Sequence, residues 1–361
     1  MIVVMNMKLK KILIISGIAV FAVTALLVTT AAIGYSIAIQ KPSMRFLLSN
    51  SGFRTPTDYT KKEIFIDVSG EKISVMAYRH PRVKSNRYFV LQHGLTPEAN
   101  KHPRINLFAA SLCDATGMNV LIPAVKGSVE GATIEKTYNR MSQIYVTLVK
   151  KFPGRYRAFG ACISANILLV ALNRVPPEIY PEKIFMLGPF FSGKGLFDFF
   201  NKIAKPEDID IMVKMALTLN MDIYTEKEKS LIRRAIAASK PGTTDRSEMK
   251  KILGRKLYND IAVVRLHHRD FEAISPGVMF GKNRSANCKY FILHSKTDNI
   301  IPFFEGRNLS DFMKKSGIST NFLGSEYLEH AQNQVSVTGF LKEMKYLIRF
   351  FDELFEGDVE R

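Results

Sequence analysis

Residues 158–169 read AFGACISANILL and place a sharp turn between an apolar strand and an apolar helix. The centre of this stretch, GACIS (160–164), has a small residue two positions before and two positions after Cys162. That order is typical of a nucleophile elbow, in which small flanking residues let the strand and the helix approach closely. Cys162 is therefore the candidate nucleophile, with Gly160 and Ser164 as its supports. A small apolar residue at the start of a buried helix is the other interpretation of this stretch alone.

Ser164 is the competing nucleophile within the same stretch. Its own flanking residues would be Cys162 and Asn166. The amide side chain of Asn166 is bulky where an elbow needs a very small residue. The sequence therefore ranks Ser164 behind Cys162.

Short apolar strands alternate with helical segments on both sides of the elbow. We expect strands at 63–68, 72–79, 87–92, 118–123, 156–160, 183–190, 289–294 and 319–325. We expect helices at 105–116, 134–151, 165–175, 303–315 and 339–355. The first two strands flank Ser69-Gly70-Glu71 and so predict a hairpin. The alternation predicts an α/β fold, with a mostly parallel sheet covered by helices on both faces.

One long block interrupts this alternation. Residues 192–288 contain several helical patterns and little strand signal. The block is too long for a loop inside a compact domain, so it predicts a helical insertion. An insertion beside an active site often acts as a lid over the substrate.

Two further residues follow the elbow in the chain order nucleophile, acid, histidine. Asp298 comes after the strand at 289–294, and His330 comes after the strand at 319–325, in a short loop. A carboxylate in that position orients an imidazole and stabilises its cationic form. An aspartate that only caps a turn has the same local sequence. Of the seven histidines, His330 is the one that falls where the acid's partner is expected.

The segment His93-Gly94-Leu95 follows a strand near the start of the domain. The backbone N–H of Leu95, together with the N–H of Ile163, is predicted to form an oxyanion hole, with His93 and Gly94 supporting the loop. An ordinary turn after a strand is the other interpretation of this segment.

With these residues in place, the chain resembles the α/β-hydrolase superfamily over roughly residues 63–356. The resemblance rests on HGLTPE (93–98), GMNVLIP (117–123), the elbow, LHSKTDNIIP (293–302) and EHA (329–331). It implies the α/β-hydrolase fold and a catalytic triad of Cys162, Asp298 and His330. The sequence departs from most members in carrying cysteine where they carry serine. Cysteine elbows are known in the similar dienelactone hydrolases and polyhydroxyalkanoate synthases.

The resemblance and the thiol together predict a hydrolase of carboxylic esters or thioesters that works through a covalent acyl-enzyme. An acyltransferase using the same thiol is the second prediction, because a thioester intermediate favours transfer as well as hydrolysis. A membrane-tethered binding protein that has lost catalysis is the third, favoured by the missing serine and by the non-glycine Ser164. The expected partner is a small acyl substrate, lipid-like substrates included, and no cofactor is implied.

The N-terminal part of the chain predicts a membrane anchor. A short basic tail (1–11) precedes a run without any charged residue from Ile12 to Gln40. About 20 apolar residues cross a bilayer as a helix, whereas the core of a signal peptide usually has about 7–15, so an uncleaved single-pass anchor is favoured. Cleavage after the small residues of Ser36-Ile37-Ala38 is the alternative. Residues 41–62 are interpreted as a polar linker and 63–361 as the hydrolase domain. The lysines of the basic tail favour an extracytoplasmic domain, and Lys41, Arg45 and Arg54 after the run nearly cancel this preference.

The charge and cysteine content limit the partners. The net charge is +18, and four of these charges flank the charge-free run, leaving +14 on residues 42–361. Because the lysines are scattered and no nucleic-acid motif is found, anionic lipid is favoured over nucleic acid. Three widely spaced cysteines predict neither disulfides nor a zinc site. The neighbours His267 and His268 point apart on the backbone, so no metal site is expected there.

Overall fold

The structure of the chain is a computed structural model. It describes residues 36, 39–94, 98–125, 134–196, 199, 225–238, 251–255, 257, 274–276, 287–298, 300–326, 328–329, 332–333 and 337–357.

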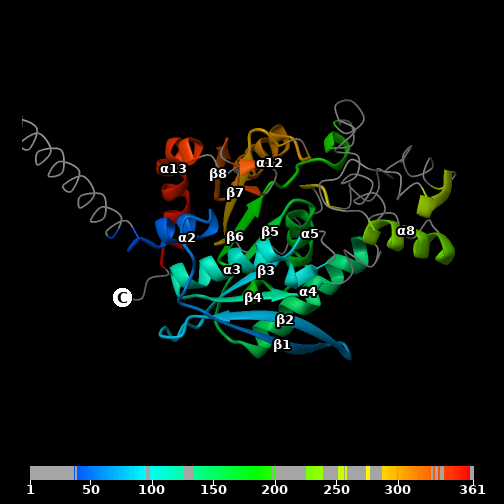
Figure 1. Cartoon of the computed structure of the whole chain (residues 1–361), viewed down its shortest axis with the longest axis horizontal. Coiled ribbons are helices and arrows are strands. Elements are labelled where there is room, and N and C mark those ends of the chain that lie inside the picture. The colour runs from blue at the N-terminus through cyan, green and yellow to red at the C-terminus, as the bar shows by residue number, and fades with distance from the viewer. Residues whose placement is uncertain are drawn as a thin grey trace, which may run out of the picture.

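An eight-stranded sheet forms the centre of the molecule, in the order β1-β2-β4-β3-β5-β6-β7-β8 (Figure 1). The strands are β1 (Thr60–Val68), β2 (Glu71–Arg79), β3 (Arg87–Gln92), β4 (Asn119–Pro123), β5 (Arg155–Ala161), β6 (Lys183–Leu187), β7 (Lys289–Ser295) and β8 (Thr320–Ser325). β2 pairs antiparallel with β1 and with β4, and the other neighbours pair parallel. The mostly parallel sheet predicted from the sequence is confirmed.

The predicted hairpin joins β1 and β2. Val68 pairs with Glu71, so Ser69 and Gly70 form a two-residue loop. Both loop residues have positive φ, +55° and +83°. A two-residue turn of this kind needs positive φ at both positions, which glycine accepts without cost and serine accepts with some strain.

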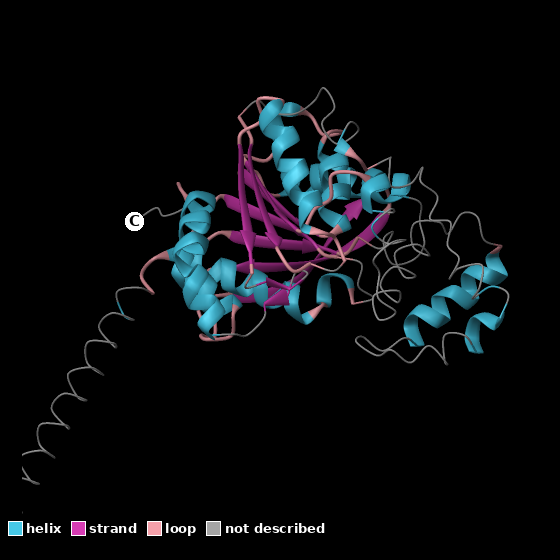
Figure 2. Cartoon of the chain, turned by 90° about the horizontal axis from the view of Figure 1, so that it is seen from above, coloured by secondary structure: helices cyan, strands magenta, loops and turns pink. Residues whose placement is uncertain are grey.

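Helices cover both faces of the sheet, as Figure 2 shows with the strands seen between two helical layers. One face carries α4 (Ile134–Lys151), α5 (Ile163–Leu172) and α12 (Phe303–Lys315), and the other carries α2 (Pro42–Asn50), α3 (Pro103–Thr116) and α13 (Val337–Phe355). Successive strand residues alternate between the two cores. In β6, for example, Ile184 and Met186 pack on the first face and Phe185 on the second. This period of two explains why the central strands read as continuous apolar runs.

The remaining described elements are short or lie outside the two layers. They are η1 (Ala99–Lys101), η3 (Pro177–Ile179), α8 (Glu226–Ala238), and the two-stranded ribbon of β9 (Leu328–Glu329) and β10 (Gln332–Asn333).

The predicted linker at 41–62 is wrong, because most of it belongs to the folded domain. Residues 42–50 form α2, and β1 already begins at Thr60. Phe46 is 1 % exposed and packs against rings of α3 and α13. The sequence PSMRFLLSN has only a weak helical stripe, so its burial depends on partners from distant parts of the chain.

The predicted anchor and most of the predicted lid fall outside the described residues. Among the residues that the structure describes, no helix is both long and apolar enough to cross a bilayer. Within the block 192–288, the structure describes residues 192–196, 199, 225–238 with α8, 251–255, 257, 274–276 and 287–288.

Candidate active site

Cys162 lies on a strained turn between β5 and α5. Its φ of +57° and ψ of −140° fall in a region that non-glycine residues rarely adopt, at a cost of about 1–3 kcal/mol. The Cys162 N–H donates to Leu187 O at 2.7 Å, and the Cys162 carbonyl accepts from the Ala165 N–H at 3.0 Å. These two bonds hold the turn from the end of β6 and from the first turn of α5.

Gly160 has no room for a side chain. A Cβ at this position would lie 2.6 Å from the Cα of Ala165, because the last residues of β5 pass directly against the start of α5. The close approach that the small residues of an elbow permit is therefore present here.

The side chains near the turn differ in accessibility. Cys162 is partly exposed, whereas Ser164 is 0 % exposed. The thiols of Cys113 and Cys288 are buried, and burial raises their pKa values, that of Cys113 to about 12. Thiols with such raised pKa values form little of the reactive thiolate. Of the three cysteines, Cys162 is thus the one placed to meet a substrate.

Asp298 lies beyond the carboxyl end of β7, which is separated from β5 by β6 alone. Its side chain is 1 % exposed, and Oδ1 accepts from the N–H groups of Ile300 and Ile301, both at 2.9 Å. The φ of Gly188, just after β6, is +60°, and a Cβ there would lie 3.6 Å from Asp298 Oδ2. The end of β6 thus lies between the candidate nucleophile and the candidate acid.

His294 supports the turn that holds Asp298. Its ring is fully buried, and Nε2 lies 2.8 Å from Ile301 O and 3.6 Å from Asp298 Oδ2. Because Ile301 O can only accept, Nε2 carries the proton. A Cβ on Gly306 of α12 would collide with this ring, so the glycine is required by close packing. The sequence reading did not single out His294.

His330, the candidate base, is outside the described residues, between β9 and β10. The residues just before His330 are hydrogen-bonded to β7, because the Ser295 hydroxyl at the end of β7 donates to Leu328 O of β9. The residues that precede His330 therefore lie beside the strand that precedes Asp298.

His93 is a structural residue rather than an exposed one. It is 1 % exposed, its Nε2 accepts from the Val125 N–H at 3.1 Å, and its Nδ1 donates to Gly94 O at 2.8 Å. Burial lowers its pKa to about 4, so the ring is neutral at pH 7. Leu95, the expected oxyanion donor, lies outside the described residues. Ile163 is the first residue of α5, where a helix leaves its N–H groups without intrahelical partners.

The segment after β6 connects the site with the start of the inserted block and with residues 274–275 inside it. Asn166 of α5 donates to Phe190 O at 2.8 Å and to Ile274 O at 3.2 Å, and its Oδ1 accepts from the Phe190 N–H at 3.2 Å. The Gly193 N–H donates to Ser275 Oγ at 3.1 Å. The segment 190–193 and residues 274–275, inside the block, are therefore held together at the first turn of α5.

Glu305 is a buried carboxylate that the sequence reading missed. It is 1 % exposed, and its Oε2 accepts from the N–H groups of Phe191 and Ser192, both at 2.8 Å. Burial raises the pKa of Glu305, although these two hydrogen bonds act in the opposite direction. The sequence feature that could have indicated this role is the position of Glu305 in the first turn of α12, a helix with a wide apolar face.

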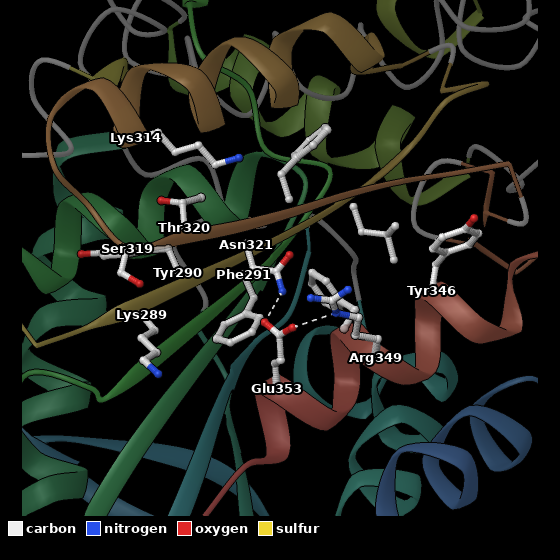
Figure 3. A pocket seen from close by; sticks show the side chains of 13 residues that line it. Lys289, Tyr290, Phe291, Lys314, Ser319, Thr320, Asn321, Tyr346, Arg349 and Glu353 are labelled. Carbon is white, nitrogen blue, oxygen red and sulfur yellow. Dashed lines mark hydrogen bonds and ion pairs between the residues drawn. The ribbon is translucent and has the colours of Figure 1, made fainter.

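One further feature lies away from the candidate active site. A cavity of about 420 Å³ is lined by the first residues of β7 and β8 and by α13, at the opposite end of β7 from Asp298. Figure 3 shows Glu353 at its centre, where it accepts from Asn321 at 2.8 Å and pairs with Arg349 at 3.3 Å. Among the described residues no group of His, Cys, Asp and Glu could hold a metal ion.

No family model and no curated protein matches the chain. Solved structures match it in fold. The closed state of Candida antarctica lipase A has a TM-score of 0.50 and 12% identity, and the match covers 84% of this chain and 78% of the lipase. The uncomplexed acylaminoacyl peptidase of Pyrococcus horikoshii has a TM-score of 0.51 and 11% identity. That match covers 86% of this chain but 43% of the peptidase, so the chain spans less than half of that protein. Together with the strand order and the strained turn after β5, these similarities identify the architecture of the chain as the α/β-hydrolase fold.

Proposed function

We propose that this protein hydrolyses carboxylic esters or thioesters, with Cys162 as the nucleophile. The observation that carries the proposal is the backbone of Cys162, which is held at positive φ with its side chain partly exposed, while Ser164 is enclosed in α5. Strain of this kind persists only where the surrounding structure imposes it, and it is often found at functional sites. A lipase and a peptidase among the structural neighbours agree with acyl chemistry on this fold.

In the proposed reaction, the Cys162 sulfur attacks the substrate carbonyl carbon, and His330 takes the thiol proton. The N–H groups of Leu95 and Ile163 stabilise the oxyanion of the tetrahedral intermediate. The intermediate collapses and expels the alcohol or thiol, which takes the proton from His330. Water then attacks the thioester, gives a proton to His330, and releases the acid as the proton returns to sulfur.

Asp298 is proposed to orient His330 and to stabilise its cationic form through Oδ2. Backbone N–H groups occupy Oδ1, which fixes the carboxylate plane. The oxygen next to Gly188, Oδ2, is the proposed partner of the imidazole. His294, which donates to Ile301 O, holds the same turn from behind.

The proposal is tested by Cys162→Ala, measured with a series of p-nitrophenyl esters and acyl-thioesters. Losing one triad member costs about 10³-fold or more in kcat/KM. His330→Ala should fall as low, and the double variant no lower, because the two side chains act as a unit. Cys162→Ser should keep part of the activity. Ser164→Ala is the matched control and should stay active. An inactive Ser164→Ala beside an active Cys162→Ala would show that the nucleophile is misassigned.

The thiol itself favours an acyltransferase as the second candidate, because a thioester can pass its acyl group to an amine or alcohol. Adding such acceptors to the ester assay separates the two: a transferase forms the new ester or amide, and a hydrolase releases only the acid. The third candidate, a binding protein without catalysis, is favoured by Ser164 in place of glycine. An electrophilic acyl probe would leave Cys162 unlabelled in that case.

We also propose that residues 12–40 anchor the protein in a membrane, with the domain on the extracytoplasmic side. The support is the absence of charge over this run. The full chain should then stay with membranes through a high-salt or carbonate wash, whereas residues 41–361 should be released. Release of the full chain by either wash would contradict the anchor.

A lid function is proposed for the block 192–288, supported by the attachment of its start and of residues 274–275 beside α5. Replacing the block with a short linker should change the preference for acyl chain length more than the labelling by a small acyl probe. Equal loss of both would make the block a structural part of the domain.

A further inference from the structure

The first helix of the domain is fixed at the end of the sheet opposite to Cys162. We call this end, where the parallel strands begin, the amino edge, and the end with Cys162 and Asp298 the carboxyl edge. The hydroxyl of Ser43, in the first turn of α2, donates to Asp352 of α13. The last turn of α13 in turn caps the amino edge, because Lys183 at the start of β6 donates to Leu354 O at 3.0 Å.

A buried carboxylate holds the same segment against α3. Asp114, whose side chain is 0 % exposed, lies in the last turn of α3, next to the start of β4. It accepts from Arg45 of α2, from Arg54, and from the N–H groups of Thr57 and Asp58. Burial opposes ionisation of Asp114, but the bonds from the two arginines and the backbone outweigh it and hold its pKa well below the usual value. Six hydrogen bonds to one carboxylate leave this entry segment little freedom.

The charge-free run reaches Gln40, and α2 begins at Pro42. Only Lys41 separates the two. Since α2 is packed through Phe46 between α3 and α13, the described chain is fixed to the sheet from α2 onward, one residue after the charge-free run. The amino edge therefore faces the surface from which the chain emerges.

The exposed charges of the amino edge suit an anionic lipid surface. Helices that follow strands run back to this edge, and the last turns of α4 and α12 carry paired lysines there, with a further lysine at the start of β7: Lys150, Lys151, Lys314, Lys315 and Lys289. Exposed Glu178 and Glu356 at the same edge offset part of this charge. A lysine near an anionic bilayer contributes about 1 kcal/mol to binding.

We propose that the active site faces away from the anchoring bilayer, so that its ester or thioester substrate arrives from water and is not a lipid of that bilayer. The inference rests on the anchor and the reaction proposed above. The seven residues of β5 separate the two edges by roughly 23 Å. Cys162 is therefore held at least that far from the lipid surface by a rigid domain.

The orientation is tested on the full chain in vesicles that contain anionic phospholipid and a headgroup-linked energy-transfer acceptor. In a Cys162→Ala background, a donor dye is placed on Lys315→Cys at the amino edge or on Lys296→Cys at the carboxyl edge. The thiols of Cys113 and Cys288 are at most 2 % exposed and should not react. We expect the dye at 315 to lie roughly 20 Å closer to the acceptor plane. Equal distances, the reverse order, or no binding to vesicles would overturn the proposal.

A second experiment uses the unaltered protein and tests whether the substrate comes from water or from the bilayer. A water-soluble p-nitrophenyl ester should be hydrolysed equally by the protein in vesicles and in detergent. A fluorescent phospholipid ester confined to the same vesicles should react at least tenfold more slowly than in detergent micelles, and equal rates would overturn the proposal. The energy-transfer result does not depend on Cys162, so a failed nucleophile and a failed orientation give different outcomes.

Discussion

The two edges of the sheet are built on opposite principles. At the amino edge, the buried charge of Asp114 is paired with Arg45 and Arg54 and accepts two backbone N–H groups. At the carboxyl edge, Cys162 has a strained backbone, and the buried Glu305 accepts from the backbone N–H groups of Phe191 and Ser192. One edge consists of favourable contacts and the other of groups that are costly to hold in place.

The difference shows how the molecule divides stability and function. Strained backbone conformations cost of order 1–3 kcal/mol each and persist only where the rest of the domain holds them. The hydrogen bonds of Asp114 and the aromatic cluster around Phe46 supply part of that support from the opposite end of the sheet. Changes at the two edges should therefore separate into effects on activity and effects on stability.

The largest effect is expected from Gly160→Ala, which adds a methyl group where β5 and α5 are in close contact. The new Cβ would lie 2.6 Å from backbone of α5, which cannot move like the end of a side chain. We expect a loss of about 3 kcal/mol or more in the free energy of unfolding, measured by urea titration of the domain. Gly94→Ala, where a Cβ meets nothing within 4 Å, is the matched control and should cost under about 1 kcal/mol. Similar losses in both variants would refute the close approach of β5 and α5.

Asp114→Asn tests the charge pairing at the amino edge, and its destabilisation should be the second largest. The amide keeps the shape but leaves Arg45 and Arg54 without their buried carboxylate. We expect a destabilisation of about 2–3 kcal/mol, below the range for fully buried pairs because the Arg45 side chain is 26% exposed. The hydrolytic rate per folded molecule should not change, and its loss would show that the two edges are coupled more closely than the contacts imply.

The pH dependence of Asp114→Asn follows from the lowered pKa of the native aspartate. Asp114 stabilises the native state above its unfolded pKa of 3.8, and this contribution is lost as pH falls through the folded pKa. The difference between the two proteins should thus be full at pH 7 and shrink below about pH 4. Asp58→Asn, at the 24% exposed rim of the same network, should cost under about 1 kcal/mol and serves as the control.

The smallest effect is expected from His93→Gln at the carboxyl edge, and it should appear only in acid. Burial lowers the pKa of His93 from 6.5 to about 4. Between these pH values His93 is therefore protonated in the unfolded chain and neutral in the native state. The original protein should lose about 1–3 kcal/mol more stability than the variant as pH falls from about 6.5 to 4. Glutamine keeps an acceptor for the Val125 N–H and does not titrate. Parallel stability curves in thermal melts at pH 7 and pH 4.5 would contradict the buried neutral ring.

The local pattern of the sequence determined the elements that depend only on neighbouring residues. The strand at 87–92, the helix at 134–151 and the hairpin at Ser69-Gly70 match the structure because period-two burial, helical spacing and turn chemistry are local properties. The Cys162 elbow was predicted for the same reason, since the small residues that it needs lie within five positions. Leu95 and His330 are outside the described residues, so the oxyanion donor and the base stay predictions from sequence.

Tertiary structure alone decided what depends on residues far apart in the chain. The segment at 42–50 was interpreted as linker because its burial requires Asp114, 69 residues after Arg45, and the rings of α13. Glu305 and Asn166 gained their roles from backbone groups 114 and 24 residues away. The side of the sheet on which the chain enters, opposite to Cys162, likewise follows from these long-range contacts. No local pattern encodes them, because hydrogen bonds and buried contacts between distant residues exist only once the sheet has brought them together.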